Sequence, residues 1–469
     1  MLLVHPVHEV LRQLPVLLGS VLLGSATGNP VWALIGVSLI VGFGLARWFT
    51  TTYRIGPDEV QLRTGLLQRK VLSVPRNRIR SVSTDARLLH RALGLTVLRV
   101  STGQQTAGDI SFSLDAVPAR EVPALRATLL AESLTPPDPA GPPGRVLARW
   151  QPSWLRYSPL TFTGLVMVAA TFGVVYETGV FTALRDTGVA RAGNSLFQSL
   201  GDGVVLAGVS IVLIASVLVS VAQSLLSYAN LELRRDADLL HLSHGLLRVR
   251  EHTFDMRRLR GGSLREPLLV RMFGGARLDA VMTGVAGAGE ASQLLPPCPR
   301  RTAESVLADL IAEPGAVTGA LTPHGPVATR RRWNRAMALP AVVAVALVVL
   351  TAFAGAPVWV WPVLAMVTLG SMFLAADRSR SLGHRVGDGW LVARAGSLQR
   401  RRDCVLAAGI VGWTVSQTLL QRRAGVATLI AATAAGLKRY EIVDVPADIA
   451  WSIAATTSPW VGATRWARG

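Results

Sequence analysis

Three segments of this chain repeat one pattern of glycines, leucines and an arginine. Shifting residues 65–98 by 180 positions superimposes them on a second segment without gaps, and shifting them by 331 positions superimposes them on a third. The matched positions are Gly65/Gly245/Gly396, Leu67/Leu247/Leu398, Ile79/Leu259/Ile410, Leu88/Leu268/Leu419, Leu89/Leu269/Leu420, Arg91/Arg271/Arg422, Gly94/Gly274/Gly425 and Leu98/Leu278/Leu429. Agreement at fixed shifts predicts three copies of one structural unit.

Long runs without charge precede each copy. Half of the residues are hydrophobic and 16% are charged, whereas soluble chains carry about 25% charged residues. A charge at the bilayer centre costs about 2.5–3.5 kcal/mol, so uncharged runs indicate membrane spans. We predict six transmembrane helices in three hairpins, with spans at 11–27, 31–49, 157–176 and 203–231 and two more within 336–376, broken at 354–357.

The arginines predict the orientation. The formal net charge is +19, and nearly all arginines lie in 50–158, 227–335, 377–469 or the N-terminal stub. Basic residues concentrate in the cytoplasmic segments of membrane proteins. The sequence therefore predicts a multi-pass membrane protein with both its N- and C-termini in the cytoplasm.

Each soluble copy is predicted to be β followed by α. In the first copy, alternating apolar and polar residues predict strands, and Asp115 predicts the N-cap of a terminal helix with Pro118 in its first turn. A short helical turn is expected over 87–93. The third copy repeats the cap signal at Asp444, and the second has a helix over 299–312. The fold class is membrane α plus β, in which each hairpin is followed by a small β-barrel or sandwich capped by a C-terminal helix.

The expected domain organisation alternates membrane and soluble segments. It comprises hairpin 1 (1–49), soluble domain 1 (50–135), a Pro/Gly-rich linker (136–156), hairpin 2 with an outer loop (157–229), soluble domain 2 (230–314), a basic linker (315–335), hairpin 3 (336–376), soluble domain 3 (377–460) and a tail (461–469).

The repeated pattern resembles a known family. Gly65-Leu66-Leu67, Arg78-Ile79 and the run from Leu88 to Leu95 are similar to the bacterial pleckstrin-homology-like (PH-like) membrane proteins of the YdbS/YdbT group. The resemblance implies hairpins joined to PH-like domains in a bacterial cell membrane, with a loose link to envelope stress and antimicrobial-peptide resistance. The third copy departs from the pattern, because Gly409 stands where the first has Arg78.

Catalytic, cofactor and metal sites are not expected. His241 and His244 lie in a strand-like run, which favours a surface or edge feature over a metal site. Asp236 and Asp238 are typical of a turn. The two cysteines, Cys298 and Cys404, have neither metal-ligand nor disulfide-framework spacing.

Two groups of arginines are candidate contacts. The repeated Arg91, Arg271 and Arg422 either tie a short turn to the barrel through backbone carbonyls or bind an anion or headgroup. Arg330, Arg331, Arg332 and Arg335, with Trp333 among them, provide a positive-inside signal and a possible contact with anionic lipid.

Two classes of function remain open. The first is a non-catalytic binding or scaffold protein whose domains face the inner leaflet. The second is a transporter or lipid-handling protein, against which the scarcity of polar groups in the predicted spans argues. The expected partners are membrane lipids, anionic inner-leaflet headgroups and another membrane protein, and no nucleic acid.

Overall fold

The computed structural model describes most of the soluble segments and one helical hairpin. The described residues are 52–56, 59–64, 70–75, 81–86, 91–101, 111–130, 144–161, 166, 210–211, 213–284, 292–355 and 357–463. They form two compact units, which are described separately. The first contains Met1–Val146 and Asn230–Arg258, and the second contains Leu147–Ala229 and Leu259–Gly469. The boundary between Arg258 and Leu259 falls inside the second copy, and the nine-segment division remains a prediction.

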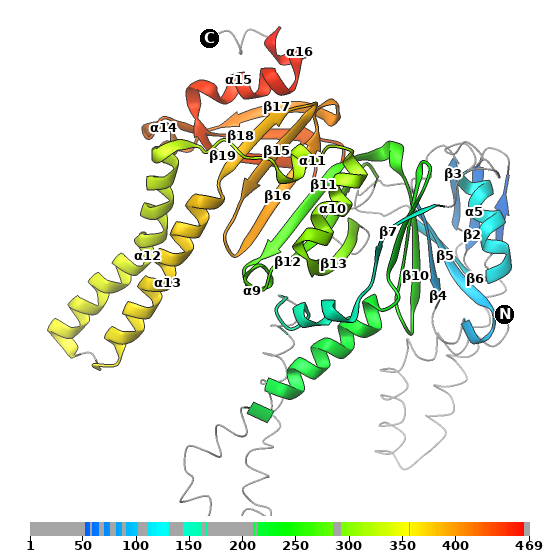
Figure 1. Cartoon of the computed structure of the whole chain (residues 1–469), viewed down its shortest axis with the longest axis horizontal. Helices are drawn as coiled ribbons and strands as arrows, with labels where there is room; N and C mark the ends of the chain where they lie inside the picture. Colours follow the sequence, from blue (N-terminus) through cyan, green and yellow to red (C-terminus); the bar gives the residue numbers. More distant parts are fainter. Residues whose placement is uncertain are drawn as a thin grey trace, which may run out of the picture. The chain divides into compact units, whose positions relative to one another are not determined.

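The first unit contains two antiparallel sheets (Figure 1). One has the order β1-β2-β3 and the other β6-β5-β4-β10-β9-β8-β7. The strands are β1 (Thr52–Ile55), β2 (Glu59–Thr64), β3 (Lys70–Pro75), β4 (Ser81–Ala86), β5 (Leu95–Ser101), β6 (Ser111–Pro118), β7 (Arg145–Arg149), β8 (Glu232–Asp236), β9 (Leu239–His244) and β10 (Val249–Asp255). The short helix η2 (Ala119–Glu121) leads into α5 (Val122–Leu130), and η4 (Met256–Arg258) ends the unit.

The core of the first copy lies between its two sheets and α5. Val60 and Val74 come from the first sheet, Val82 and Leu98 from the second, and Leu129 from the helix. Each is at most 1% exposed. Because apolar and polar residues alternate along the strands, each sheet has one apolar face, and the two apolar faces pack together in a sandwich that the helix closes.

The second unit also contains two antiparallel sheets, of order β13-β12-β11-β16-β15-β14 and β17-β18-β19. The strands are β11 (Leu259–Pro267), β12 (Gly275–Met282), β13 (Gln293–Pro299), β14 (Gly383–Gly387), β15 (Trp390–Ala395), β16 (Gln399–Leu406), β17 (Ile410–Ser416), β18 (Val426–Thr433) and β19 (Arg439–Pro446). The helices are η3 (Pro152–Tyr157), α9 (Leu268–Met272), α10 (Arg300–Ile311), α11 (Pro314–Thr318), α12 (Gly325–Ala354), α13 (Val360–Ser381), η6 (Ala407–Gly409), α14 (Leu419–Arg423), α15 (Ala447–Thr457) and α16 (Pro459–Gly462). Buried residues of β15, β18, β19 and α15 form the core of the third copy.

Consecutive copies share sheets. The last three strands of copy one continue into the first three strands of copy two, because β4 pairs with β10. The last three strands of copy two continue into the first three of copy three, because β11 pairs with β16. In both cases the fourth strand of one copy lies antiparallel to the third strand of the next.

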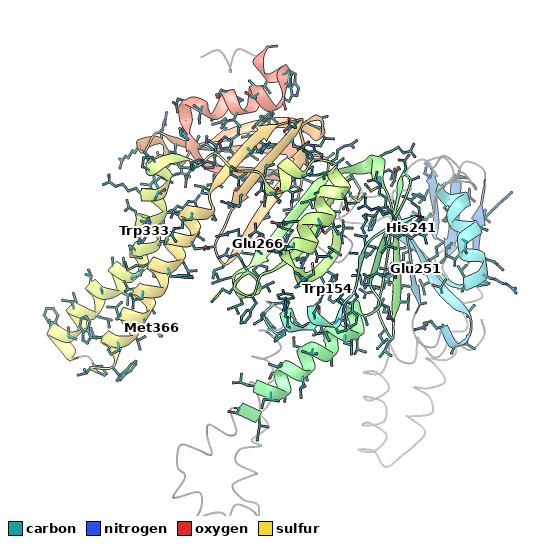
Figure 2. The ribbon with its side chains drawn as sticks, viewed as in Figure 1. Trp154, His241, Glu251, Glu266, Trp333 and Met366 are labelled. Atoms are coloured by element: carbon teal, nitrogen blue, oxygen red, sulfur yellow. The ribbon has the colours of Figure 1, made fainter. Side chains whose placement is uncertain are left out.

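The helices α12 and α13 form a hairpin that extends from the sheets of the second unit (Figure 1). α12 ends at Ala354, and Gly355 follows it with φ 70°, a conformation that glycine adopts without strain. In Figure 2, Trp333 lies on the part of the hairpin near the sheets, and Met366 lies closer to the turn.

The prediction of six transmembrane helices is wrong. Within the described residues, the chain has four β-sheets and two helices long and apolar enough to span a bilayer, at Gly325–Phe353 and Val360–Ser381. The apolar helix Leu213–Tyr228 is shorter. The predicted spans 11–27 and 31–49, and most of 157–176, lie outside the described residues.

The error arises because a run without charge need not be one continuous helix. The predicted third span begins at Tyr157, which instead ends η3 and is fully buried. The Tyr157 hydroxyl donates to the carbonyl of Phe273 at 3.3 Å, so this residue belongs to a soluble domain. The fourth predicted span likewise ends in Ala229 and Leu231, which are buried beside the start of β8.

The predicted N-cap at Asp115 is also wrong. Pairing with β5 continues β6 to Pro118, which becomes the residue before the helix. Pro299 and Pro446 take the same place before α10 and α15. Each first helical N–H donates instead to the carbonyl of a left-handed glycine, as Ala119 does to Gly94 at 2.9 Å.

Candidate functional site at the base of the helical hairpin

Asp444 of β19 lies at the centre of a buried ion-pair network. Its side chain is 0% exposed, and its backbone has φ 57°, a left-handed conformation that Asp and Asn adopt more readily than most residues. Arg331 Nε lies 3.3 Å from its Oδ1, and Arg332 Nη2 lies 3.0 Å from its Oδ2. Gln421 Nε2 donates to Oδ1 at 2.9 Å. The carboxylate therefore joins the first turns of α12 to β19 and α14.

Two histidines lie beside this network. His324, the residue before α12, has its Nδ1 2.8 Å from the carbonyl of Val443, and His384 Nδ1 lies 3.1 Å from His324 Nε2. The carbonyl can only accept, so His324 carries its proton on Nδ1 and accepts on Nε2. Burial lowers the pKa of His324 to about 4 and also lowers the pKa of His384. Both rings are therefore neutral near pH 7.

A second ion-pair cluster joins the end of α13 to the sheets. Asp377 lies 2.7 Å from Arg271 of α9 and 2.7 Å from Arg400 of β16. Glu266 of β11 is 3.9 Å from Arg400 and 3.4 Å from Arg300. The hairpin is therefore joined to its domain at both ends, through Asp444 at α12 and Asp377 at α13.

The hairpin base also carries exposed positive charge. Arg330 and Arg335 of α12 and Arg378 and Arg380 of α13 are exposed. These four exposed residues, here called the basic belt, border the apolar part of the hairpin.

The structure places the four predicted linker arginines in two different environments. Arg331 and Arg332 are 14% and 11% exposed and are engaged with Asp444. Arg330 and Arg335 are exposed and belong to the basic belt. Contact with anionic lipid therefore remains a proposal, best supported for the exposed pair.

The three repeated arginines do not share one partner. Arg91 donates to the carbonyl of Leu246 at 2.9 Å, which ties its turn to the following copy within the first unit. Arg271 pairs with Asp377 at the hairpin base. Arg422 is exposed on α14, and its backbone N–H donates to the carbonyl of Thr418.

Sequence reasoning did not single out Asp444 as an ion-pair centre, nor Asp377, His324 or His384. The only signal was local: Asp377 is the first charge after the long uncharged run, and His324 precedes the arginine cluster. The partners of these residues lie far away in the sequence, as Arg331 and Asp444 do, so spacing could not identify the pairs.

The histidines considered as metal ligands have other partners. His241 Nδ1 lies 3.1 Å from Thr253 Oγ1, and its Nε2 lies 3.5 Å from Asp236. His244 stacks against His252 with ring centroids 6.2 Å apart. Within the part of the chain that the structure describes, no group of three His, Cys, Asp or Glu residues is placed to hold a metal ion.

A two-sheet sandwich closed by a C-terminal helix and repeated along a chain defines a class of small binding modules. The family model for the bacterial PH domain matches this chain three times, at residues 10–133, 187–313 and 335–458. The chain therefore belongs to the bacterial PH domain family, as the resemblance of the repeated motifs predicted. No curated protein and no solved structure matches it. Repeated PH domains indicate a binding or scaffold role.

Proposed function

We propose that this protein is a membrane-anchored, non-catalytic scaffold. The hairpin α12–α13 lies in the bilayer, and the PH domains at its base hold lipid headgroups and a second membrane protein at the cytoplasmic face. Both termini are on that side. Survival of a deletion strain under cationic antimicrobial peptides tests the envelope-stress role that the resemblance implies.

The observation that carries this proposal is the bare apolar surface of the hairpin. In each helix, only 6% of the hydrophobic 18-residue stretch is buried against the protein, whereas the core helix of a soluble domain would be mostly buried. Phe353, Trp359 and Met366 are 88%, 66% and 68% exposed. Contiguous apolar surface of this kind is stable in lipid and costly in water.

The basic belt supports the same placement. The exposed arginines lie where the apolar stretch ends, which is the depth of lipid phosphates when such a hairpin is inserted. Each basic residue near an anionic leaflet adds about 1 kcal/mol of attraction. Arg330 and Arg335 on one helix and Arg378 and Arg380 on the other therefore fit a ring of headgroups.

A transport path through this hairpin is not favoured. The hydroxyl of Thr351 donates to the carbonyls of Leu347 and Val348 in its own helix, and that of Thr368 donates to Leu364. These polar groups are satisfied within the helices, whereas transport pathways usually present polar groups to a cavity.

Lipid retention by the full-length protein tests the headgroup contact. The double variant Arg330→Gln/Arg335→Gln should retain fewer anionic lipids than wild type after mild detergent extraction, as counted by native mass spectrometry. The difference should shrink as salt is raised, because the contact is electrostatic and exposed.

A matched control removes the same charge elsewhere. Arg301 and Arg439 are exposed on the soluble domains, so Arg301→Gln/Arg439→Gln should leave the anionic lipid count unchanged. Equal losses in both double variants would show an effect of net charge and would contradict a specific belt. No loss in either would remove the lipid contact from the proposal.

A further inference from the structure

The pairing between copies leaves one strand edge of copy one and one of copy three unpaired among the strands that the structure describes. β4 and β11 occupy the same position in copies one and two, and each pairs with the third strand of the next copy. The equivalent strand of copy three is β17. Among the described strands, β17 is an edge that pairs with β18 alone.

The free edge of β17 has the composition of a strand that pairs. Its sequence, Ile-Val-Gly-Trp-Thr-Val-Ser, contains no charge and no proline. Val411 is 70% exposed. Soluble edge strands usually carry charge or proline to prevent such pairing, and β17 carries neither.

The helical turn beside β17 is exposed where its counterpart is covered. In copy two, Leu268 N–H donates to the carbonyl of Leu398 in the next copy at 2.7 Å, and Leu268 and Leu269 are half-buried. Their counterparts in copy three, Leu419 and Leu420, are 78% and 67% exposed. The same surface is therefore bare in copy three.

The complementary edge is β3, the third strand of copy one. Its counterparts β10 and β16 each pair with the preceding copy. Among the described strands, β3 pairs with β2 alone. Val71 on this strand is 56% exposed.

We propose that β17 of one chain pairs antiparallel with β3 of a second copy of this chain. The register follows from the pairing of β11 with β16. Adding 151 residues, the shift between copies two and three, moves β11 onto β17, and subtracting 331 residues, the shift between copies one and three, moves β16 onto β3. Gly261 opposite Val405 becomes Gly412 opposite Val74, and Arg265 opposite Arg401 becomes Ser416 opposite Lys70.

This interface joins two different surfaces, so it is heterologous. Each chain offers one β17 edge and one β3 edge, and the contact therefore generates closed rings or open rows of chains rather than two-fold dimers. It requires no lipid contact from the basic belt, so it stands or fails independently of the headgroup proposal.

Mixed disulfide cross-linking in membranes tests the register. One differently tagged chain carries Ser416→Cys and the other Lys70→Cys. Ser416 is exposed, and the native cysteines are buried and do not compete. Treatment with an oxidant should produce a cross-linked species containing both tags.

A chain with Val71→Cys in place of Lys70→Cys is the register control. Neighbouring strand residues point to opposite faces, so this position should cross-link at least several-fold less. The variant Val411→Lys, which adds charge to the exposed edge, should reduce cross-linking between Ser416→Cys and Lys70→Cys. Absence of the mixed-tag species, or equal yields from positions 70 and 71, would overturn the proposal.

Discussion

At the residue scale, the most consequential group is the carboxylate of Asp444. It is fully buried, holds a left-handed backbone conformation and faces two arginines of α12. Buried ion pairs add little net stability relative to apolar packing, but removal of one partner leaves the other charge uncompensated. We therefore expect the ion pairs of Asp444 with Arg331 and Arg332 to fix the position of α12 on its domain.

The variant Asp444→Asn should lower the stability of the second unit by up to about 3–5 kcal/mol. Asparagine keeps the size and tolerates the left-handed backbone, so the loss reports the missing charge and the exchange of one acceptor oxygen for an N–H donor, and not a cavity or backbone strain. Thermal unfolding in detergent measures it. The exposed pair Arg439–Glu441 provides the control, since Glu441→Gln should change the midpoint little. Equal shifts in the two variants would contradict a special role for Asp444.

The buried histidine pair predicts a pH dependence. His324 faces His384, Arg332, Asp444 and the carbonyl of Val443, and burial lowers its pKa from 6.5 to about 4. The unfolded chain therefore binds this proton more readily than the folded chain. The contribution of neutral His324 to the free energy of unfolding is complete above about pH 6.5 and is lost as the pH falls toward 4. The full loss is about 3 kcal/mol.

Unfolding midpoints of wild type and His324→Gln between pH 4 and 7 check this dependence. The variant should have a flatter profile, because the glutamine amide can donate to the Val443 carbonyl and does not titrate. His241→Gln, in the first unit, should keep the wild-type slope. An unchanged slope in His324→Gln would show that another group causes any acid instability.

The sequence predicted the arginine cluster but not its division between two tasks. Arg330, Arg331, Arg332 and Arg335 lie within six residues of one helix, and the helical period indicates only that they cannot all face the same side. Which of them meets a carboxylate depends on Asp444, more than one hundred residues away. The contact with Asp444 therefore determines which of the four arginines are buried, and the spacing of the arginines does not.

At the element scale, the sequence predicted the strands of each copy better than their partners. Period-2 alternation identifies the inward face of a strand, and it contains no information on which strand lies beside it. The pairing of β4 with β10 and of β11 with β16 was therefore not predictable from one copy. The spans failed for a different reason, since charge-free runs included soluble-domain residues, such as Tyr157 at the start of the predicted third span.

Gly261 makes the junction between copies two and three testable. Its φ is 141°, and a Cβ there would meet the backbone carbonyl of Cys404 on β16. Gly261→Ala should destabilise the second unit, with about 1–3 kcal/mol from overpacking alone. Gly387→Ala, in β14 of the same unit, is the matched control, because a Cβ there would have no atom within 4 Å. Chemical denaturation should separate the two variants, and equal stability would contradict the close approach of β11 and β16.

At the scale of the whole molecule, the orientation of the hairpin decides what the PH domains can reach. Both ends of the hairpin lie at the domain side, where α12 begins and α13 ends. An orientation with the arginine-rich domains in the cytoplasm follows the positive-inside rule. The turn near Val358 is then on the outer side, and Arg439 on the third copy is inside.

The native cysteines cannot report this orientation, but they should give little background in a cysteine-labelling experiment. Cys298 and Cys404 are fully buried, and burial raises the pKa of each thiol to about 12. The thiolate is the reactive form, so wild type should resist maleimide labelling before and after permeabilisation.

Introduced cysteines then read the topology directly. Val358 is 83% exposed at the turn, and the Arg439 side chain is 62% exposed on its domain. An impermeant maleimide should label Val358→Cys in intact cells and Arg439→Cys only after permeabilisation. Labelling of Arg439→Cys in intact cells would place the PH domains outside. Labelling of Val358→Cys only after permeabilisation would mean that its turn does not reach the outer face. Either result would contradict a hairpin that crosses the membrane with its domains in the cytoplasm.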